Sequence, residues 1–169
     1  MNTVGETAAA LTHVDASGAA RMVDVSAKDP SIRTATATGV LRTTAQVVEL
    51  LQHNSLPKGD ALATARIAGI MGAKRTPDLV PLCHPIAISG VSVELEVGNA
   101  EVRISATVRT TDRTGVEMEA LTAVAVAGLT LHDMIKAVDP AAVLGEIRVE
   151  RKDGGKTGSW VRPDDGSPS

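Results

Sequence analysis

The near absence of aromatic side chains restricts how this chain can build its core. The sequence contains no Phe and no Tyr, and its single aromatic residue, Trp160, stands close to the C-terminus. Large aromatic side chains usually contribute much of the buried area of a core. Here the core must consist of Ala, Val, Leu, Ile and Met, whose smaller side chains let helices and strands approach closely. A binding site must also recognise its ligand without Phe or Tyr, through aliphatic walls, backbone polar groups and charged side chains.

The composition indicates one soluble globular unit. The chain has 169 residues, of which 43% are hydrophobic and 22% are charged, as expected for a single domain over residues 1–169. We expect residues 1–10 and 161–169 to be flexible ends. The net charge of -3 argues against a general nucleic-acid-binding protein, which usually carries a clustered basic excess.

Cysteine usage and hydropathy predict a location in the cytoplasm. Cys83 is the sole cysteine, which excludes an internal disulfide and any zinc site with several cysteines. The N-terminal segment has neither a basic start nor a long apolar stretch, so we do not interpret it as a signal peptide. The longest apolar run, 120–131, is too short to span a bilayer.

The first half of the chain predicts two strands followed by two helices. A short strand is expected at 21–26, and β-branched residues alternate with others from Ile32 to Val40. Thr43 and Gln46 form a capping-box pattern that opens a helix reaching about residue 53. Asp60 can cap a second helix, which Thr76-Pro77 stops.

The second half of the chain predicts a hairpin, a long helix and a last strand. Apolar residues alternate with polar ones over 91–97 and again over 102–109, with Gly98-Asn99 between them. A long helix is expected over 116–138, and a last strand around Ile147 and Val149. The order of elements predicts an α+β fold, a ferredoxin-like two-layer sandwich with a mainly antiparallel sheet and helices on one face.

Asp133 and Lys136 are candidate functional residues near the end of the long helix. They are three residues apart and therefore share one face of the helix. An ordinary surface ion pair is one interpretation of this spacing. Alternate steps of three and four residues, however, lead back through an apolar stripe formed by Leu129, Val126, Thr122 and Glu119. The stripe predicts that the two charges are partly buried, with pKa values open to tuning.

Two loop segments supply further candidates. Pro81 and Pro85 enclose Cys83 and His84, and rigid backbone on both sides suits an imidazole with a fixed direction. The alternative is a histidine in a buried turn beside a packed cysteine. Lys58 stands just before the helix that Asp60 opens, where an ammonium group could complete a phosphate site. A solvated loop lysine explains this segment equally well.

The glycine-rich segment at 154–157 does not form a P-loop. A P-loop needs a glycine five residues before its Gly-Lys pair, and that position is Glu150. No convincing helix follows the segment either. A Gly-Lys loop that closes on a phosphate group remains an open interpretation of Lys156.

Four segments together resemble the MoaC family, the cyclic pyranopterin monophosphate synthases. They are MVDVSAK (22–28), KGDALATARIAGIMGAKRTPDLVPLCHP (58–85), TGVEMEALTAVAVAGLTLHDMIKAV (114–138) and GGKTG (154–158). The resemblance implies a lyase of molybdenum cofactor biosynthesis that converts (8S)-3′,8-cyclo-7,8-dihydroguanosine 5′-triphosphate to cyclic pyranopterin monophosphate and releases pyrophosphate. It implies a ferredoxin-like fold and a homohexamer, a trimer of dimers, with active sites at subunit interfaces.

The resemblance also assigns roles to individual residues. The catalytic positions of the family fall on Asp133, Lys136 and Lys58. The substrate-binding positions fall on Leu82, Cys83, His84, Met118, Glu119, Arg33, Lys152 and Lys156. No cofactor is required and no protein metal site is implied, although a divalent cation can accompany the phosphates.

Two non-enzymatic functions compete with this interpretation. The same scaffold could serve as a non-catalytic nucleotide- or phosphate-binding module, or as an assembly protein whose long helix forms a subunit interface. Neither function needs an acid and several cations converging on one ligand, so Asp133, Lys136, Lys58 and His84 favour the enzyme. A different phosphate lyase or cyclase is the nearest enzymatic alternative.

Overall fold

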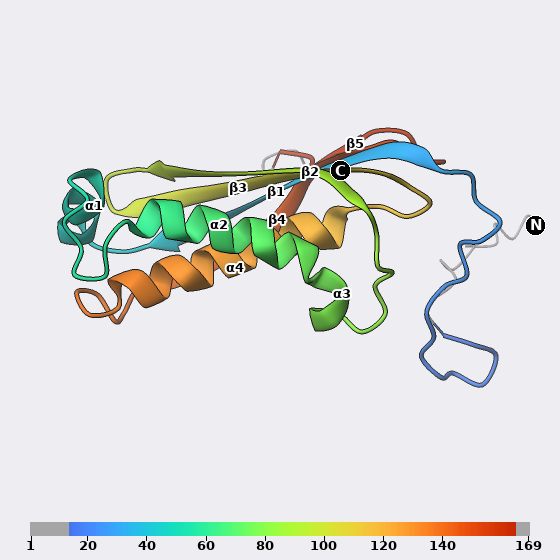
Figure 1. Cartoon of the computed structure of the whole chain (residues 1–169), viewed down its shortest axis with the longest axis horizontal. Coiled ribbons are helices and arrows are strands. Elements are labelled where there is room, and N and C mark those ends of the chain that lie inside the picture. The colour runs from blue at the N-terminus through green and yellow to red at the C-terminus, as the bar shows by residue number, and fades with distance from the viewer. Residues whose placement is uncertain (1–13, 165–169) are drawn as a thin grey trace, which may run out of the picture.

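A five-stranded antiparallel sheet forms one layer of the structure, and helices cover one of its faces (Figure 1). The computed structural model describes residues 14–164. The strands are β1 (Ser31–Arg42), β2 (Ile88–Val97), β3 (Glu101–Asp112), β4 (Val143–Asp153) and β5 (Trp160–Val161). The helices are α1 (Ala45–Gln52), α2 (Ala61–Lys74), α3 (Thr76–Leu79) and α4 (Glu117–Ile135).

The order of the strands confirms the expected α+β fold. The sheet runs β2-β3-β1-β4-β5, with β1 between β3 and β4 and every pair antiparallel. Helices α2 and α4 pack side by side on one face, so the β1–α–β2–β3–α4–β4 part has the predicted ferredoxin-like arrangement. The expected strand over 32–40 lies within β1, and the expected hairpin is β2–β3.

The strand expected at 21–26 is absent from the structure. This segment is extended and then turns before β1, and it joins none of the strands of the sheet. The backbone carbonyl of Val23 instead accepts a hydrogen bond from His84 Nε2 at 2.6 Å. The alternating valines therefore serve a contact with a loop and not a sheet.

The helix caps agree with the sequence at α2 and differ at α1. Asp60 Oδ1 accepts a hydrogen bond from the backbone N–H of Ala63 at 3.0 Å, as predicted. At α1 the N-cap is Thr44, whose hydroxyl accepts from Val47, so the capping box expected from Thr43 is wrong by one residue. Thr43 Oγ1 instead donates to the buried Asp139 carboxylate at 2.7 Å. Its partner comes from the far end of the chain, which local sequence cannot reveal.

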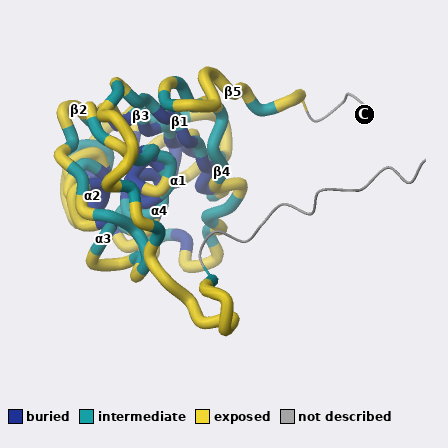
Figure 2. The backbone as a smooth tube through the Cα atoms, turned by 90° about the vertical axis from the view of Figure 1, so that its right-hand side faces the viewer, coloured by how far each residue is buried: buried dark blue, intermediate teal, exposed yellow. Residues whose placement is uncertain are grey.

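Small residues bring the two long helices into close contact, as the composition predicts. A Cβ atom on Gly69 would lie 2.9 Å from the backbone oxygen of Ala123, and one on Gly72 would lie 2.9 Å from Val126 Cβ. Buried residues are concentrated where the helices and the sheet face each other, whereas most of the segment before β1 is exposed (Figure 2).

Helix α4 is the central helix of this core. Ten of its residues are buried, and it packs against α2 and the sheet. It ends at Ile135, three residues earlier than expected, and Lys136 is its C-cap. Its 19 residues and mean hydropathy of 1.3 would by length and composition alone suffice to cross a membrane. The core helices of soluble proteins pass the same test.

Strand β4 is irregular where it pairs with β1. Arg151 pairs with Thr36 and Val149 with Ala37, so Glu150 is the extra residue of a β-bulge. A second irregularity precedes Arg148, where Glu146 has a φ of 54°. The short strand β5 then pairs with the end of β4. The prediction that the flexible C-terminal end begins at residue 161 therefore places its start too early, because Val161 belongs to β5. Residues 1–10 and 165–169 of the expected ends lie outside the described residues.

Candidate active site

The predicted site residues form two groups at opposite ends of α4. Lys58, Asp133 and Lys136 meet at its C-terminal end, and the predicted substrate-binding residues lie around its N-terminal end. Because α4 has 19 residues, its ends are about 27 Å apart. One chain by itself therefore does not bring the two groups together.

An ion-pair cluster occupies the C-terminal end of α4. Lys136 Nζ lies 2.7 Å from Asp133 Oδ1, and Lys58 Nζ lies 2.9 Å from Asp133 Oδ2. Lys58 also donates to the backbone oxygen of Asp133 at 3.0 Å. Gly59, with a φ of 93°, forms the turn that delivers Lys58 from the loop before α2. Each carboxylate oxygen thus binds one ammonium group.

The two lysines hold Asp133 in its ionised form. Hydrogen bonds from Lys136 and Lys58, with their positive charges, lower the pKa of Asp133 from 3.8 to about 2. The side chains of this cluster are about half exposed in the single chain. Partial burial was expected from the stripe on α4, and that expectation is wrong: the stripe starts at buried Glu119 and Thr122 and turns outward to Leu129, which is 63% exposed.

A cavity of about 430 Å³ lies beside the N-terminal end of α4. Its walls come from the loop before β2, the first turn of α4 and the segment before β1. Predicted site residues in these walls are Leu82, Cys83, His84, Met118 and Glu119. Because the Val23 carbonyl can only accept, His84 carries its proton on Nε2. This hydrogen bond to Val23 fixes the direction of the imidazole.

Glu119 is a buried carboxyl group in this cavity. Only 3% of the residue is exposed, and burial raises its pKa from 4.5 to about 7, with a further contribution from Glu117. Burial, and then the charge of Glu119, also raise the pKa of the Cys83 thiol. Cys83 therefore stays protonated near neutral pH and acts as a wall of the cavity, since a nucleophilic cysteine must be a thiolate.

A second cavity, of about 730 Å³, has cationic walls. Arg33 and Lys28 line it together with the loop that carries Lys156. Two tight turns shape this loop. Gly154 has a φ of 97°, and a Cβ atom there would collide with the carbonyl oxygen of Ile32, so only glycine fits. The glycines that could not form a P-loop instead press the loop against β1.

A small cavity of about 70 Å³ connects Arg33 with Lys152. Lys152 Nζ lies 3.2 Å from Glu117 Oε1, and this salt bridge connects the end of β4 to the first turn of α4. The predicted residues Arg33, Lys152 and Lys156 therefore do gather in one region.

Lys28 was not predicted from the sequence, although it lines both the cavity of about 430 Å³ and the cavity of about 730 Å³. It stands within the MVDVSAK segment, but no local pattern distinguishes it from a surface lysine. Its place becomes visible only when the segment before β1 folds against the loop that contains His84. In the described residues 14–164, no group of three or more His, Cys, Asp or Glu side chains is arranged to hold a metal ion.

The fold is that of a ferredoxin-like protein. Cavities lined by cations lie at the N-terminal end of its central helix α4, and Asp133 lies between two lysines at the C-terminal end. The family model described as the MoaC family matches residues 22–155, and the chain belongs to this family.

Curated relatives match nearly the whole chain. A protein of Streptomyces coelicolor named cyclic pyranopterin monophosphate synthase is 66% identical over 152 residues, which cover 90% of this chain and 89% of that protein. Cyclic pyranopterin monophosphate synthase 2 of Mycobacterium tuberculosis H37Rv is 63% identical over 152 residues, with 90% and 91% covered. A synthase of the same name from Roseiflexus is 56% identical over 153 residues, with 89% and 97% covered.

Proposed function

We propose that this protein is a cyclic pyranopterin monophosphate synthase, a lyase that acts early in molybdenum cofactor biosynthesis. Its substrate is (8S)-3′,8-cyclo-7,8-dihydroguanosine 5′-triphosphate, and its products are cyclic pyranopterin monophosphate and pyrophosphate. The observation that carries this proposal is the match to relatives of that name at 63–66% identity over 90% of the chain. The gathering of cations at one end of α4 supports it independently.

The cationic cavity is suited to the triphosphate. Arg33, Lys152 and Lys156 offer donors for charge-assisted hydrogen bonds, each contributing about 1.5–3 kcal/mol to binding. The neighbouring cavity is suited to the ring system, which packs on Leu82 and Met118 because no Phe or Tyr is available for stacking. Glu119 faces the ring there as a carboxyl that can either donate or accept a hydrogen bond near neutral pH.

The ion-pair cluster is suited to proton transfer. Asp133 is ionised well below neutral pH, so it starts the reaction as a proton acceptor, and the ammonium groups of Lys58 and Lys136 are the donors. In the closing step a sugar hydroxyl attacks the α-phosphorus, its proton passes to a base, and the bond to pyrophosphate breaks. Cations around the leaving pyrophosphate stabilise the charge that develops on it.

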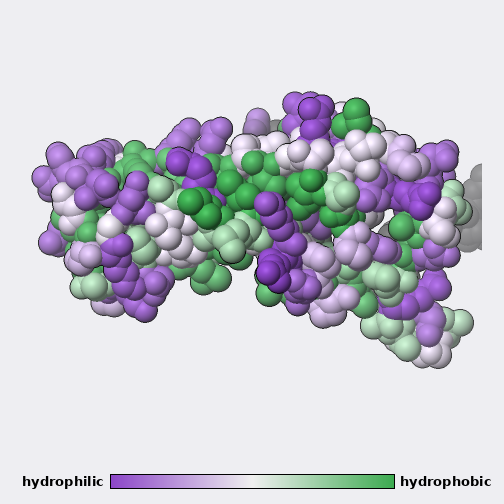
Figure 3. Space-filling view, viewed as in Figure 1, coloured by the Kyte–Doolittle hydropathy of each residue, from purple (hydrophilic) through white to green (hydrophobic). Residues whose placement is uncertain are grey.

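A site that uses both ends of α4 requires two chains. Glu119 and Asp133 lie on α4 about 21 Å apart along the helix axis, and catalysis needs contacts of about 3 Å. We therefore place the active site at a subunit interface of a homo-oligomer, a hexamer built as a trimer of dimers, in the cytoplasm. Exposed Ile67, Met71 and Leu129 provide apolar surface for subunit contacts, and Figure 3 shows apolar surface along the middle of one face.

Mixing two inactive variants tests the shared site. Asp133→Asn disables the cluster and His84→Ala disables the cavity, and each variant alone should be inactive. After unfolding and refolding the two together, half of the dimers contain one chain of each kind, and one of their two sites is intact. We expect about a quarter of the wild-type activity to return. Absence of any recovered activity in verified mixed oligomers would contradict the shared site.

Turnover of the purified protein tests the proposed reaction. Incubation with the cyclic dihydroguanosine triphosphate should yield cyclic pyranopterin monophosphate and pyrophosphate, detected by mass spectrometry. Asp133→Asn should bind substrate and barely convert it, whereas Arg33→Ala should mainly weaken binding. Turnover should persist in EDTA, because the proposed chemistry needs no resident metal. Binding without product would instead identify a nucleotide-binding module.

A further inference from the structure

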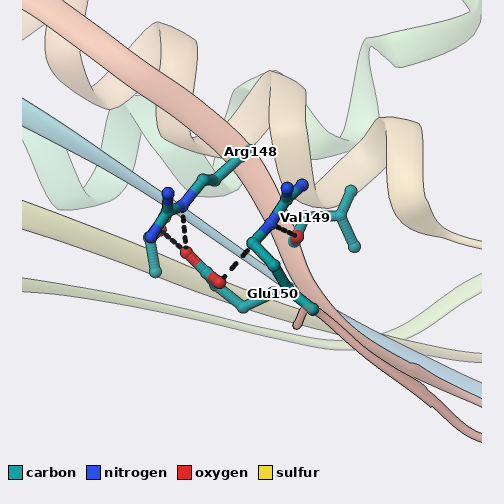
Figure 4. Close-up of polar contacts among 5 residues, drawn as sticks. Arg148, Val149 and Glu150 are labelled. Carbon is teal, nitrogen blue, oxygen red and sulfur yellow. Dashed lines mark hydrogen bonds and ion pairs between the residues drawn. The ribbon is translucent and has the colours of Figure 1, made fainter. Parts of the chain in front are cut away.

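The short strand β5 is fastened to β4 by a polar network centred on Glu150 (Figure 4). The bulge turns Glu150 so that Oε1 accepts hydrogen bonds from Thr38 Oγ1 at 2.6 Å and from Arg148 Nε at 2.8 Å. Arg162 Nε lies 3.7 Å from Glu150 Oε2 and donates to the carbonyl oxygen of Val149 at 2.8 Å. The backbone N–H of Arg162 donates to the carbonyl oxygen of Glu150 at 2.8 Å.

This network attaches β5 to β4, together with a hydrogen bond from Ser159 Oγ to Asp153 Oδ1 at 2.6 Å. The strand has two residues, and its ladder with β4 consists of two pairs, Val161 with Arg151 and Trp160 with Lys152. Such a short ladder provides little stability of its own. Arg162 extends the attachment past the ladder. It donates hydrogen bonds to the backbone carbonyls of Val149 and Glu150 and forms an ion pair with the carboxylate of Glu150.

The loop between β4 and β5 carries Lys156 and forms one wall of the cationic cavity. Within it, Gly154 N–H donates to Gly158 O at 3.1 Å, and Gly158 N–H donates to Gly155 O at 3.3 Å. The close approach of Gly154 to the carbonyl oxygen of Ile32 holds the start of the loop against β1. The far end of the loop is held at β5 by the Arg162 contacts and by the hydrogen bond from Ser159 to Asp153.

Trp160 connects the same attachment to Lys152. The guanidinium carbon of Arg162 lies 5.7 Å from the centre of the Trp160 ring, within the range of a cation–π contact. Trp160 also borders a cavity together with Glu117, Val149 and Lys152. Because Trp160 is the single aromatic residue of the chain, its fluorescence reports on this junction alone.

We infer that Arg162 is a positioning residue: bound at the Glu150 bulge, it holds β5 so that Lys156 lines the cationic cavity beside Arg33 and can bind the pyrophosphate portion of the substrate. The inference rests on the proposed function for the identity of the ligand. Arg162 does not touch the ligand itself and acts through the loop.

Binding of inorganic pyrophosphate to the full chain tests this inference, measured by calorimetry and by Trp160 fluorescence. Lys156→Gln should raise the Kd about tenfold, as expected for one lost charge-assisted contact. Arg162→Gln should raise it by a similar factor, and the double variant should be no weaker than the weaker single variant, because both changes disable the same contact. The matched control is Arg103→Gln, which removes an exposed arginine at the other end of the sheet and should leave the Kd unchanged.

Three outcomes would overturn the inference. Unchanged pyrophosphate binding in Arg162→Gln would remove the role of Arg162, and unchanged binding in Lys156→Gln would remove the loop from the phosphate site. Multiplicative effects in the double variant would mean that Arg162 does not act through Lys156. The three outcomes are read from pyrophosphate binding alone. A failure of the proposed reaction would instead appear as absence of product in the assay of the wild-type protein, so the two failures can be distinguished.

A second variant keeps the test valid if Arg162→Gln does not fold. Glu150→Gln keeps an oxygen for the Thr38 hydroxyl but removes the charge that attracts Arg162, and it should weaken pyrophosphate binding by about threefold. In folded variants with activity, the KM for the substrate should rise while kcat stays within about twofold, since uniform binding is lost. A general structural defect would instead lower kcat in proportion to the unfolded fraction, and that result would contradict positioning.

Discussion

The buried carboxyl of Glu119 should make the stability of the protein depend on pH. Its folded-state pKa is about 7, against an ordinary value of 4.5. The native protein therefore retains a proton that the unfolded chain has already lost between these two pH values. The perturbation that isolates this effect is Glu119→Gln, which keeps the size of the side chain and removes its titration.

The sign and size of the effect follow from proton linkage. Because the folded state binds more protons than the unfolded state, the contribution of Glu119 to the free energy of unfolding falls as pH rises from about 4.5 to about 7, and this contribution is constant outside the window. The pKa shift corresponds to about 3 kcal/mol at about 1.4 kcal/mol per unit. Water in the adjacent open cavity screens the carboxylate, which reduces the expected loss to about 1–2 kcal/mol.

Urea unfolding of the wild type and of Glu119→Gln between pH 4 and 8 measures this loss. Both proteins should be compared at the same protomer concentration, because subunit association adds to apparent stability. The difference in unfolding free energy should shift in favour of Glu119→Gln through the window and then level off. Parallel curves for the two proteins would refute the argument that burial holds the proton on Glu119.

Three further substitutions test the fold. Gly69→Ala should destabilise the protein by about 1–2 kcal/mol in thermal unfolding, because the close contact with the α4 backbone outweighs the gain in helix propensity. Gly90→Ala is the control and should change stability much less, because a Cβ atom there would lie in open space. Thr44→Ala should lower the free energy of unfolding by about 1 kcal/mol because the N-cap of α1 is lost, while Gln46→Ala should lower it little. A larger loss in Gln46→Ala than in Thr44→Ala would instead support the capping box formed by Thr43 and Gln46. Gly154→Ala should raise the KM for the triphosphate substrate about tenfold or more, because a side chain there displaces the loop from β1; an unchanged KM would contradict the close approach.

Periodicity was sufficient to predict the elements that form the sheet and the central helix. Alternation located β1 and the β2–β3 hairpin, since one face of each is buried by the helices. The strand expected at 21–26 is wrong, because alternation alone does not show whether a segment has a partner strand. The α1 cap was assigned to the wrong threonine of an adjacent pair, since only the contact with distant Asp139 distinguishes them.

The candidate site could be predicted residue by residue but not as an arrangement. The spacing of Asp133 and Lys136 does give the observed contact, and Lys58 joins it from a loop. Their exposure was not predicted, because steps of three and four residues follow a line that drifts around the helix away from the buried face. Lys28 was missed for a related reason: its position depends on how an irregular segment packs.

The bulge at Glu150 and the irregularity near Glu146 have a consequence for aggregation. In the described part of the chain, β5 pairs only with the end of β4, so most of β4 is an open sheet edge that includes exposed Val143 and Ile147. A regular apolar edge can template pairing with another chain. Here the broken register, the left-handed residue Glu146 and the charged side chains of Glu146, Arg148 and Glu150 leave no straight row of backbone groups for such a strand. The distortion that orients Glu150 thus also makes this edge of the sheet a poor template for pairing with a strand of another chain.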